Sequence, residues 1–393
     1  MEAPASSSHN RSVLVSALGI TQILAWGSSY YLPAVLAGPI AEDTGWSLAA
    51  VVAGLSCGLL LAGIVSPTTG RLIQRHGGRP VLVASSLLFA SALALMAISE
   101  DYPIYILAWL LMGLGMSSGL YDAGFATLGR LYGPGARSAI TTLTLFGGFA
   151  STVCWPLSAF LVESYGWRTA CIAYAAIHLL ICLPLHALLV PKLASVAVLR
   201  SHDPSPVRTT EPSVRNRFVL LAVILTLAAL IASTLSVHLI AVLELRGLDL
   251  AVAVGLGALI GPSQVAARVV DLVVGRNRHH PIWTMLASVA LLATGIGLLI
   301  VSLPLTALAL ILYGAGNGIH TIARGALPLI IFDPKEYAAV MGKLGMPSLL
   351  IQALAPSLGA ILLAHSETSM LAVLFSFAVL NVGLVVVLAR TLR

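Results

Sequence analysis

The stretch from Val51 to Arg79, VVAGLSCGLLLAGIVSPTTGRLIQRHGGR, combines the two features that decide the fold. Its first part holds no charged side chain, and arginines then occupy positions 71, 75 and 79. An apolar helix of about 20 residues is long enough to cross a lipid bilayer, and clustered arginines favour the cytoplasmic end of such a helix. The stretch therefore predicts a membrane-spanning helix followed by a cytoplasmic loop.

The same alternation runs through the whole chain of 393 residues, of which 58% are hydrophobic and only 9% are charged. A soluble domain needs more charge on its surface, so we expect most of the chain to lie in the lipid bilayer. The first apolar run is too long for a signal-peptide core. We predict an all-α membrane protein with twelve transmembrane helices, at 13–36, 47–69, 80–99, 104–127, 138–162, 167–190, 218–242, 248–267, 282–302, 304–326, 344–364 and 369–389.

The distribution of Lys and Arg sets the predicted orientation. With the amino terminus in the cytoplasm, all of the 21 basic residues except Arg168 and Arg246 fall on the cytoplasmic side. This sorting is typical of polytopic membrane proteins. It also explains the net charge of +6 as an orientation signal, so no nucleic-acid partner is expected. We expect a multi-pass protein of the cell (inner) membrane, given a bacterial host, with both termini cytoplasmic.

A polar, proline-containing segment at 191–217 divides the predicted helices into two sets of six. We interpret it as a cytoplasmic linker, mostly without fixed structure, between an amino-terminal bundle at 1–190 and a carboxy-terminal bundle at 218–393. A weak internal repeat at an offset of 201 supports the division, because several Pro and Gly residues coincide. These are Pro80 with Pro281, Pro103 with Pro304, Gly113 with Gly314, and Gly115 with Gly316.

The loop Gly70-Arg-Leu-Ile-Gln-Arg-His-Gly-Gly-Arg79 resembles the signature G-x-L-x-D-R-x-G-x-[RK] of the major facilitator superfamily, with Gln74 at the position of the family's Asp. The resemblance implies two pseudo-symmetric six-helix bundles, a secondary transporter that acts as a monomer, and a cytoplasmic gating loop formed by Gly70, Arg75, Gly77 and Arg79. The chain is also loosely similar to bacterial monocarboxylate and oxalate/formate carriers, through its aromatic first span and Gly-rich fourth span.

Four polar residues of the tenth span, Tyr313, Asn317, His320 and Arg324, share one stripe of the predicted helix. A guanidinium group suits a carboxylate or another small anion, and a histidine can take up a proton near neutral pH. We therefore expect Asn317, His320 and Arg324 in the substrate pathway. The alternative is that Arg324 lies at the inner interface and binds a lipid phosphate or a helix end.

Asp122 is the acidic residue that we place inside a span, and a carboxylate partly removed from water can alternate between charged and neutral forms. Asp122 and His320 are the candidates for proton coupling; the alternative for Asp122 is an ion pair with Arg130 or Arg71. In the eighth span, Gln264 shares a face with Arg268 and Asp271. We favour mutual neutralisation of the latter two over contact with a substrate.

In the first span, Gln22, Trp26 and Tyr30 recur at intervals of four residues. They are pathway candidates or, alternatively, packing residues, and Gln352 is a further pathway candidate. We interpret His178 as structural. The four cysteines lack CxxC spacing, so no disulfide framework or metal site is expected. Cys57 and Cys154 stay open as thiols for a trivalent metalloid.

No Walker loop, GxSxG or HExxH motif occurs, so the chain is not expected to be an enzyme or to hold a cofactor. The energy for transport must then come from an existing gradient, used by proton coupling or by exchange for a counter-substrate. The first hypothesis is a transporter of a small organic anion that works by alternating access. The second is an efflux carrier for a neutral, lipophilic (drug-like) or metalloid solute.

Overall fold

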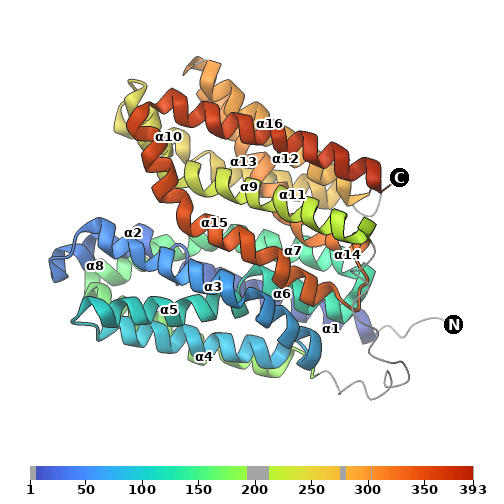
Figure 1. Ribbon diagram of the computed structural model, residues 1–393. Helices are drawn as coiled ribbons and strands as arrows, with labels where there is room; N and C mark the ends of the chain where they lie inside the picture. Colours follow the sequence, from blue (N-terminus) through green and yellow to red (C-terminus); the bar gives the residue numbers. More distant parts are fainter. Residues whose placement is uncertain (1–5, 193–211, 275–279, 302, 393) are drawn as a thin grey trace. The chain divides into compact units, whose positions relative to one another are not determined.

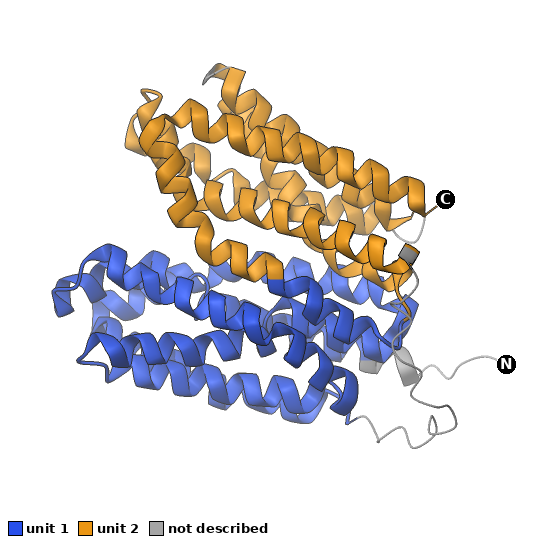
Figure 2. Ribbon diagram, in the orientation of Figure 1, with its two compact units in different colours: residues 1–196, 334–346 blue, residues 197–333, 347–393 orange. Residues whose placement is uncertain are grey.

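The computed structural model describes residues 6–192, 212–274, 280–301 and 303–392 of the chain, and within these ranges the secondary structure is helical throughout, with no β-strand (Figure 1). The chain divides into two compact units (Figure 2). Unit 1 comprises residues 1–196 and 334–346, and unit 2 comprises residues 197–333 and 347–393.

Most of unit 1 comes from the first part of the chain. Its elements are α1 (Ser6–Gly27), α2 (Pro33–Thr44), α3 (Leu48–His76), α4 (Gly78–Ala97), α5 (Tyr102–Gly119), α6 (Tyr121–Tyr132), the 3-10 turn η1 (Gly133–Ala136), α7 (Arg137–Gly148), α8 (Ala150–Ile177), and the π-helical segments η2 (His178–Cys182) and η3 (Leu185–Leu189). Gly166 interrupts α8 with a φ of 80°, a conformation that glycine adopts without strain.

Unit 2 contains the later helices. They are α9 (Pro212–Leu245), α10 (Leu250–Gly257), α11 (Ile260–Val274), α12 (Pro281–Val301), the 3-10 turn η6 (Leu303–Leu305), α13 (Thr306–Ala326), α14 (Pro328–Ile331), the second part of α15 (Tyr337–His365) and α16 (Glu367–Thr391). The first part of α15, up to residue 346, belongs to unit 1.

Most predicted spans coincide with one helix or with two helices in succession, but α8 covers the end of the span predicted at 138–162 and the start of that at 167–190, which continues through η2 and η3. Among the described residues, eight helical runs are long and apolar enough to cross a membrane, and one of them, Tyr102–Leu189, contains several helices. The number of twelve crossings therefore stays a prediction. Residues 193–211 of the predicted linker lie outside the described residues, and α9 already begins at Pro212, so the end of that segment is helical rather than irregular.

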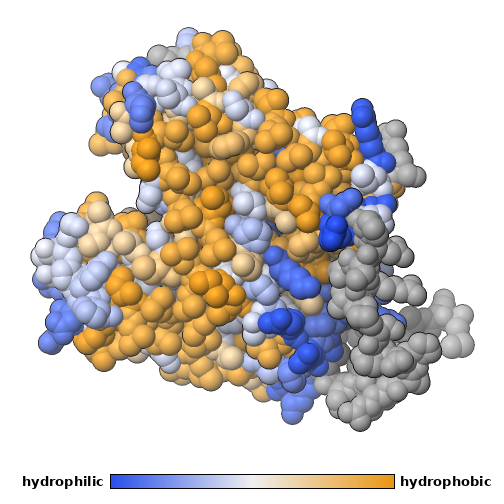
Figure 3. All heavy atoms as spheres, viewed as in Figure 1, coloured by the Kyte–Doolittle hydropathy of each residue, from blue (hydrophilic) through white to orange (hydrophobic). Residues whose placement is uncertain are grey.

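The surfaces of both units have the polarity that a bilayer requires. In Figure 3, hydrophobic residues cover the sides of the helices in each unit and hydrophilic residues gather toward the helix ends. Large apolar side chains such as Ile64 and Phe160 are more than half exposed. Lipid is the solvent in which such exposure costs nothing.

The glycines of the predicted repeat occupy matching places in the two units. A methyl group at Gly113 would lie 3.0 Å from Gly58 Cα of α3, and one at Gly314 would lie 3.0 Å from Ile260 Cα of α11. Two residues further along, Gly115 meets α4 and Gly316 meets α12. Small residues at these positions let the helix backbones approach closely, so α5 and α13 each pack between the corresponding pair of neighbours.

The two arginines that depart from the charge sorting both have local partners. Arg168 forms an ion pair with Asp43 at the end of α2, and it also donates a hydrogen bond of 3.3 Å to the Ser99 carbonyl. Arg246 donates to the carbonyl groups of Leu299 and Ile300, in the last turn of α12. A cation at a helix carboxyl end is favourable because the helix dipole is negative there.

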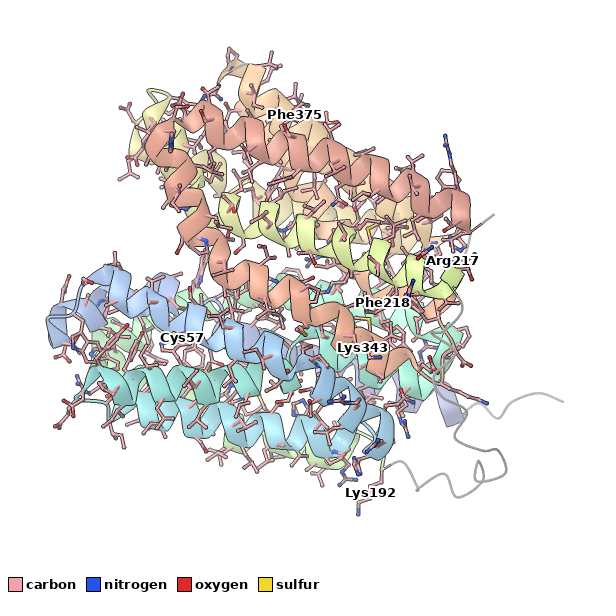
Figure 4. All side chains as sticks on the ribbon, viewed as in Figure 1. Cys57, Lys192, Arg217, Phe218, Lys343 and Phe375 are labelled. Atoms are coloured by element: carbon pink, nitrogen blue, oxygen red, sulfur yellow. The ribbon has the colours of Figure 1, made fainter. Side chains whose placement is uncertain are left out.

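Residues at the opposite helix ends also meet within each unit. Arg11 of α1 donates hydrogen bonds to the Gly135 carbonyl at 2.7 Å and to Ser138 Oγ at 2.8 Å. In unit 2, Arg217, labelled near the start of α9 in Figure 4, donates to the Thr391 carbonyl. Both contacts join segments that the charge distribution assigns to the same side of the membrane.

Unit 1 gains the first part of α15 through a close crossing with α3, which we call the α3–α15 crossing. A methyl group at Gly70 would lie 2.5 Å from the Ala338 carbonyl oxygen and 2.9 Å from Gly342 Cα. Ser66 Oγ donates a 2.9 Å hydrogen bond to the Gly342 carbonyl. Figure 4 labels Lys343 on this part of α15. The crossing therefore depends on two glycines that leave room for backbone contact.

Replacing Gly342 by alanine should weaken the α3–α15 crossing, because its methyl group would lie 2.9 Å from Gly70 Cα. Overpacking of this kind costs about 1–3 kcal/mol, and we expect a lower unfolding temperature of the purified protein in detergent. Gly383→Ala in α16 is the matched control, because a methyl group there meets no atom within 4 Å. Equal unfolding temperatures for the two variants would contradict the crossing.

The ion pair of Asp43 with Arg168 predicts a dependence of stability on pH. The hydrogen bond from Arg168, followed by that from Trp167, lowers the pKa of Asp43 below its ordinary value of 3.8. A carboxyl with a lowered pKa stabilises the fold above its unfolded pKa, and that contribution is lost as the pH falls through the folded pKa.

At about pH 6, wild-type protein should therefore unfold at a higher temperature than Asp43→Asn, and the difference should shrink toward about pH 3. Thermal unfolding of both proteins across this range is the measurement. A difference that is independent of pH would argue against the ion pair.

Candidate functional site

Of the predicted spans of unit 1 that are broken, the first and the fourth have their breaks side by side. The first span divides between Gly27 of α1 and Pro33 of α2, and the fourth divides at Leu120 between α5 and α6. Gln22 connects them: its Nε2 donates a 2.6 Å hydrogen bond to the Gly119 carbonyl, and its side chain is fully buried. Discontinuous transmembrane helices often form the binding sites of transporters.

An aromatic cluster surrounds this junction. Trp26 Nε1 donates to Gln22 Oε1 at 3.2 Å, and the Trp26 ring lies 5.1 Å from the Tyr121 ring and 5.4 Å from the Tyr30 ring, between centroids. We define the aromatic cluster as Trp26, Tyr30, Tyr31, Tyr121, Phe125 and Trp155. The predicted residues Gln22, Trp26 and Tyr30 thus occur together, and Tyr121 is a member that helix spacing alone did not indicate.

Asp122 lies in the first turn of α6, one residue beyond Tyr121. A methyl group at Gly345 would lie 2.7 Å from Asp122 Oδ2 and 2.8 Å from Ser66 Oγ. Asp122, Ser66, Thr69 and Ser117 contribute to the lining of a cavity of about 10 Å³, close to the size of one water molecule. The carboxyl group is therefore adjacent to the α3–α15 crossing.

The predicted gating loop begins at this crossing. Gly70 makes the close approach described above, and Gly77 has a φ of 83°, which favours glycine. Gln74, which stands where the family has an Asp, donates from Nε2 to the Lys335 carbonyl. Arg75 is exposed and Arg79 is half-buried. A neutral amide-to-carbonyl hydrogen bond therefore connects this loop to the start of α15.

The predicted stripe of the tenth span lies on α13 of unit 2. Tyr313 and His320 are buried, whereas Asn317 and Arg324 are half-buried. His320 Nδ1 lies 3.4 Å from Ser288 Oγ of α12, so the imidazole is directed toward that helix. His320 is therefore the member of the stripe whose side chain packs at the contact of α13 with α12.

Arg268 of α11 is buried, with only 3% of its surface exposed. Its Nε donates a 3.1 Å hydrogen bond to the Gly318 carbonyl of α13, and Nη2 makes a long contact of 3.5 Å with Gln264 Oε1. Asp271 instead accepts a hydrogen bond from Thr284 Oγ1 of α12 at 3.3 Å. The favoured prediction of mutual neutralisation is therefore wrong, because the two side chains point to different helices.

Gln352 lies in the second part of α15. Its Nε2 donates to the Ser348 carbonyl of the same helix at 3.1 Å. Its backbone carbonyl has no N–H partner at Pro356, and Ser233 Oγ of α9 makes a long contact of 3.4 Å with it. His238 of α9 reaches the Pro356 carbonyl at 2.9 Å. These contacts give His238 a structural role at a proline in a membrane-spanning helix, and the contact of Ser233 with Gln352 involves only the Gln352 backbone.

Two histidines, in η2 and η3, make side-chain contacts with the first predicted span. His178 Nε2 lies 2.8 Å from Ser28 Oγ, and His186 bridges Thr21 Oγ1 at 3.0 Å and Ser86 Oγ at 2.9 Å. The structural interpretation of His178 agrees with this arrangement. His186 was not singled out from the sequence, because an isolated histidine in an apolar run carries no spacing signal.

No group of three or more His, Cys, Asp or Glu residues is positioned to hold a metal ion in the part of the chain that the structure describes. Cys154 is buried against Ile23 and Gly27, and Cys57 of α3, labelled in Figure 4, is half-buried. The two thiols lie on different helices, α3 and α8, and the structure describes no contact between them.

The family model of the Major Facilitator Superfamily matches residues 18–278, more than half of the chain. Monocarboxylate transporter 11 of Homo sapiens is 28% identical over 174 residues, which cover 43% of this chain and 33% of that protein. The 3-(3-hydroxy-phenyl)propionate transporter of Escherichia coli (strain K12) is 27% identical over 179 residues, covering 44% and 41%. The alignments thus span 33% and 41% of the length of these relatives.

Solved structures resemble nearly the whole chain. The human organic anion transporter MFSD10 (TETRAN) superposes with a TM-score of 0.72 at 18% identity, over 98% of this chain and 100% of that one. The transporter FucP in the outward conformation gives 0.71 at 11% identity, over 97% and 99%. At these identities the likeness concerns the fold.

Replacing Gln22 by leucine should destabilise unit 1, because Gly119 and Trp26 would each lose a hydrogen-bond partner at a buried helix break. An unsatisfied buried polar group costs about 1–3 kcal/mol, and the unfolding temperature should fall accordingly. Gln352→Leu is the control, since the Gln352 amide bonds only within its own helix in the described contacts. A larger effect at Gln352 than at Gln22 would refute this role.

Proposed function

Because the chain belongs to the Major Facilitator Superfamily, whose members carry small molecules across membranes, we propose that it is a secondary active transporter of a small organic anion. In this proposal the two six-helix halves alternate in exposing a central site to each side of the membrane. The substrate moves with protons or in exchange for a counter-substrate.

The observation that carries the anion assignment is the buried guanidinium of Arg268. A cation within a membrane-spanning helix is costly, by about 2.5–3.5 kcal/mol on insertion scales, so such residues mark functional pathways. Arg268 is bonded to the Gly318 carbonyl of α13, the helix that also carries Asn317, His320 and Arg324. Two arginines on neighbouring helices suit a carboxylate, which a planar guanidinium binds through paired hydrogen bonds.

The names of the two aligned relatives support the same class of solute. One is named for monocarboxylates and the other for 3-(3-hydroxy-phenyl)propionate, so both names contain a carboxylate. The aromatic cluster around Trp26 and Tyr121 would provide an apolar surface for the carbon skeleton of such a substrate. Gln22, Tyr30, Gln264 and Gln352 complete the proposed pathway.

Proton coupling is assigned to Asp122, with His320 as a second candidate. Asp122 lies beside Ser66 and Gly345 at the α3–α15 crossing, so a change of its charge would act on the contacts of α3 with α15. Gly70, Arg75, Gly77 and Arg79 form the gating loop in this proposal. The bound proton and the substrate shift the two conformations only through unequal affinity for them.

The proposal includes a location and an assembly state. The sorting of Lys and Arg supports a cell (inner) membrane protein with both termini in the cytoplasm. The contacts of Arg11 with Gly135 and of Arg217 with Thr391 are compatible with this sidedness. We further propose that the protein acts as a monomer.

Uptake of radiolabelled monocarboxylates into proteoliposomes tests the proposal. Arg324→Ala and Arg268→Ala should each reduce carboxylate uptake about 10- to 100-fold, because a hydrogen bond to a charged group contributes about 1.5–3 kcal/mol. Arg268→Lys should restore only part of the uptake, since lysine lacks the planar fork. Arg390→Gln, at the exposed end of α16, is the matched control and should transport normally.

In the same assay, Asp122→Asn should remove the dependence of uptake on an imposed pH gradient while retaining exchange. Neutral lipophilic solutes and arsenite serve as the second set of substrates. Transport of these solutes that survives Arg324→Ala, with no carboxylate transport by wild-type protein, would instead establish the efflux carrier for a neutral or metalloid solute.

A further inference from the structure

Unit 2 contains an open groove that the proposed pathway does not use. It has a volume of about 620 Å³ and lies between α11 and α12, with α13 as its floor. Gly314 and Gly318 bring α11 close to α13, and Gly316 brings α12 close to α13, whereas alanines such as Ala267 and Ala287 line the gap. We call this feature the lateral groove.

The lateral groove is apolar along most of its length and opens on exposed side chains. Val270 is 59% exposed and Ile311 is 41% exposed, and both contribute to the lining. The lining runs from Ser263 to Asp271 on α11 and from Trp283 to Leu291 on α12. At 1.5 Å per residue, these segments are about 12 Å long, which is most of the acyl chain region of one bilayer leaflet, about 15 Å thick.

One end of the lateral groove is polar. Asp271 lies near the end of α11, and Trp283 and Thr284 lie in the first turn of α12, at the end where these two helices adjoin the loop between them. Thr284 Oγ1 donates to Asp271 Oδ1 at 3.3 Å, which fixes the carboxylate at the mouth of the groove. Tryptophan is enriched at this depth, where lipid headgroups meet the hydrocarbon.

Asp271 is the charged side chain among the described residues that line the lateral groove, and it selects the occupant. Among the described residues, the Asp271 carboxylate has no ion pair, and Arg268 is directed toward α13 instead. A carboxylate beside an exposed indole ring suits an ammonium group, through charge and a cation–π contact. The same carboxylate repels an organic anion and an anionic lipid.

We propose that the lateral groove binds a phospholipid with a primary ammonium headgroup, phosphatidylethanolamine, with one acyl chain along Ala267 and Ala287 and the ammonium on Asp271. The site lies within unit 2 and is independent of the transported solute. A neutral lipophilic molecule would fill the apolar part equally well, but its binding would not depend on Asp271.

Fluorescence quenching by brominated lipids tests this site on the full-length protein in nanodiscs. Phosphatidylethanolamine, phosphatidylcholine and phosphatidylglycerol, each with brominated acyl chains, are titrated into a phosphatidylcholine bilayer. The signal of Trp283 is the difference between wild-type protein and Trp283→Phe. We expect this signal to be quenched at a roughly fivefold lower fraction of phosphatidylethanolamine than of the other two lipids.

Asp271→Asn should remove the preference and leave quenching equal for all three lipids, whereas Asp271→Glu should retain it and guards against a folding defect. Asp249→Asn is the matched control, because it removes a carboxylate at the start of α10, elsewhere in unit 2. Equal quenching by the three lipids in wild-type protein, or an unchanged preference in Asp271→Asn, would overturn the proposal. So would displacement of the brominated lipid by a neutral lipophilic solute at equal potency in both proteins.

Discussion

The structure depends on one constraint: inside a bilayer, each backbone N–H and C=O group needs a partner within the protein. Helices satisfy it along most of the chain, and polar side chains satisfy it where a helix is interrupted. Gln22 does so for the Gly119 carbonyl at the α5–α6 break, and Ser233 approaches the Gln352 carbonyl that faces Pro356. Some polar residues that the sequence suggests as pathway candidates, such as Gln22, therefore satisfy backbone groups at helix interruptions.

The same constraint explains the exceptions in the charge pattern. Arg168 and Arg246 lie on the wrong side for the orientation rule, and each is neutralised locally, by Asp43 and by the last carbonyls of α12. A paired or capped arginine adds little to the field that orients a helix. The remaining basic residues all agree with a single orientation of the chain in the membrane.

Close packing adds a second requirement, and glycine meets it. The repeat at an offset of 201 is a repeat of contacts, because Gly113 and Gly314 face α3 and α11, and the glycines two positions later face α4 and α12. Neither Gly70 nor Gly342 coincides with a glycine at the offset of 201. Their contact attaches the first part of α15 to unit 1, next to Asp122, and so joins the proposed gating loop to the proposed proton site.

The sequence by itself determined the all-helical membrane class and the family, because hydropathy, basic loops and the Gly70–Arg79 signature are local patterns. It also brought together Gln22, Trp26 and Tyr30, which helical spacing places on one face. Tertiary structure decided the breaks at Leu120 and after Gly27, the separate partners of Arg268 and Asp271, and the inward packing of His320. Those features depend on which neighbouring helix accepts a hydrogen bond, and a single sequence contains no record of its neighbours in space.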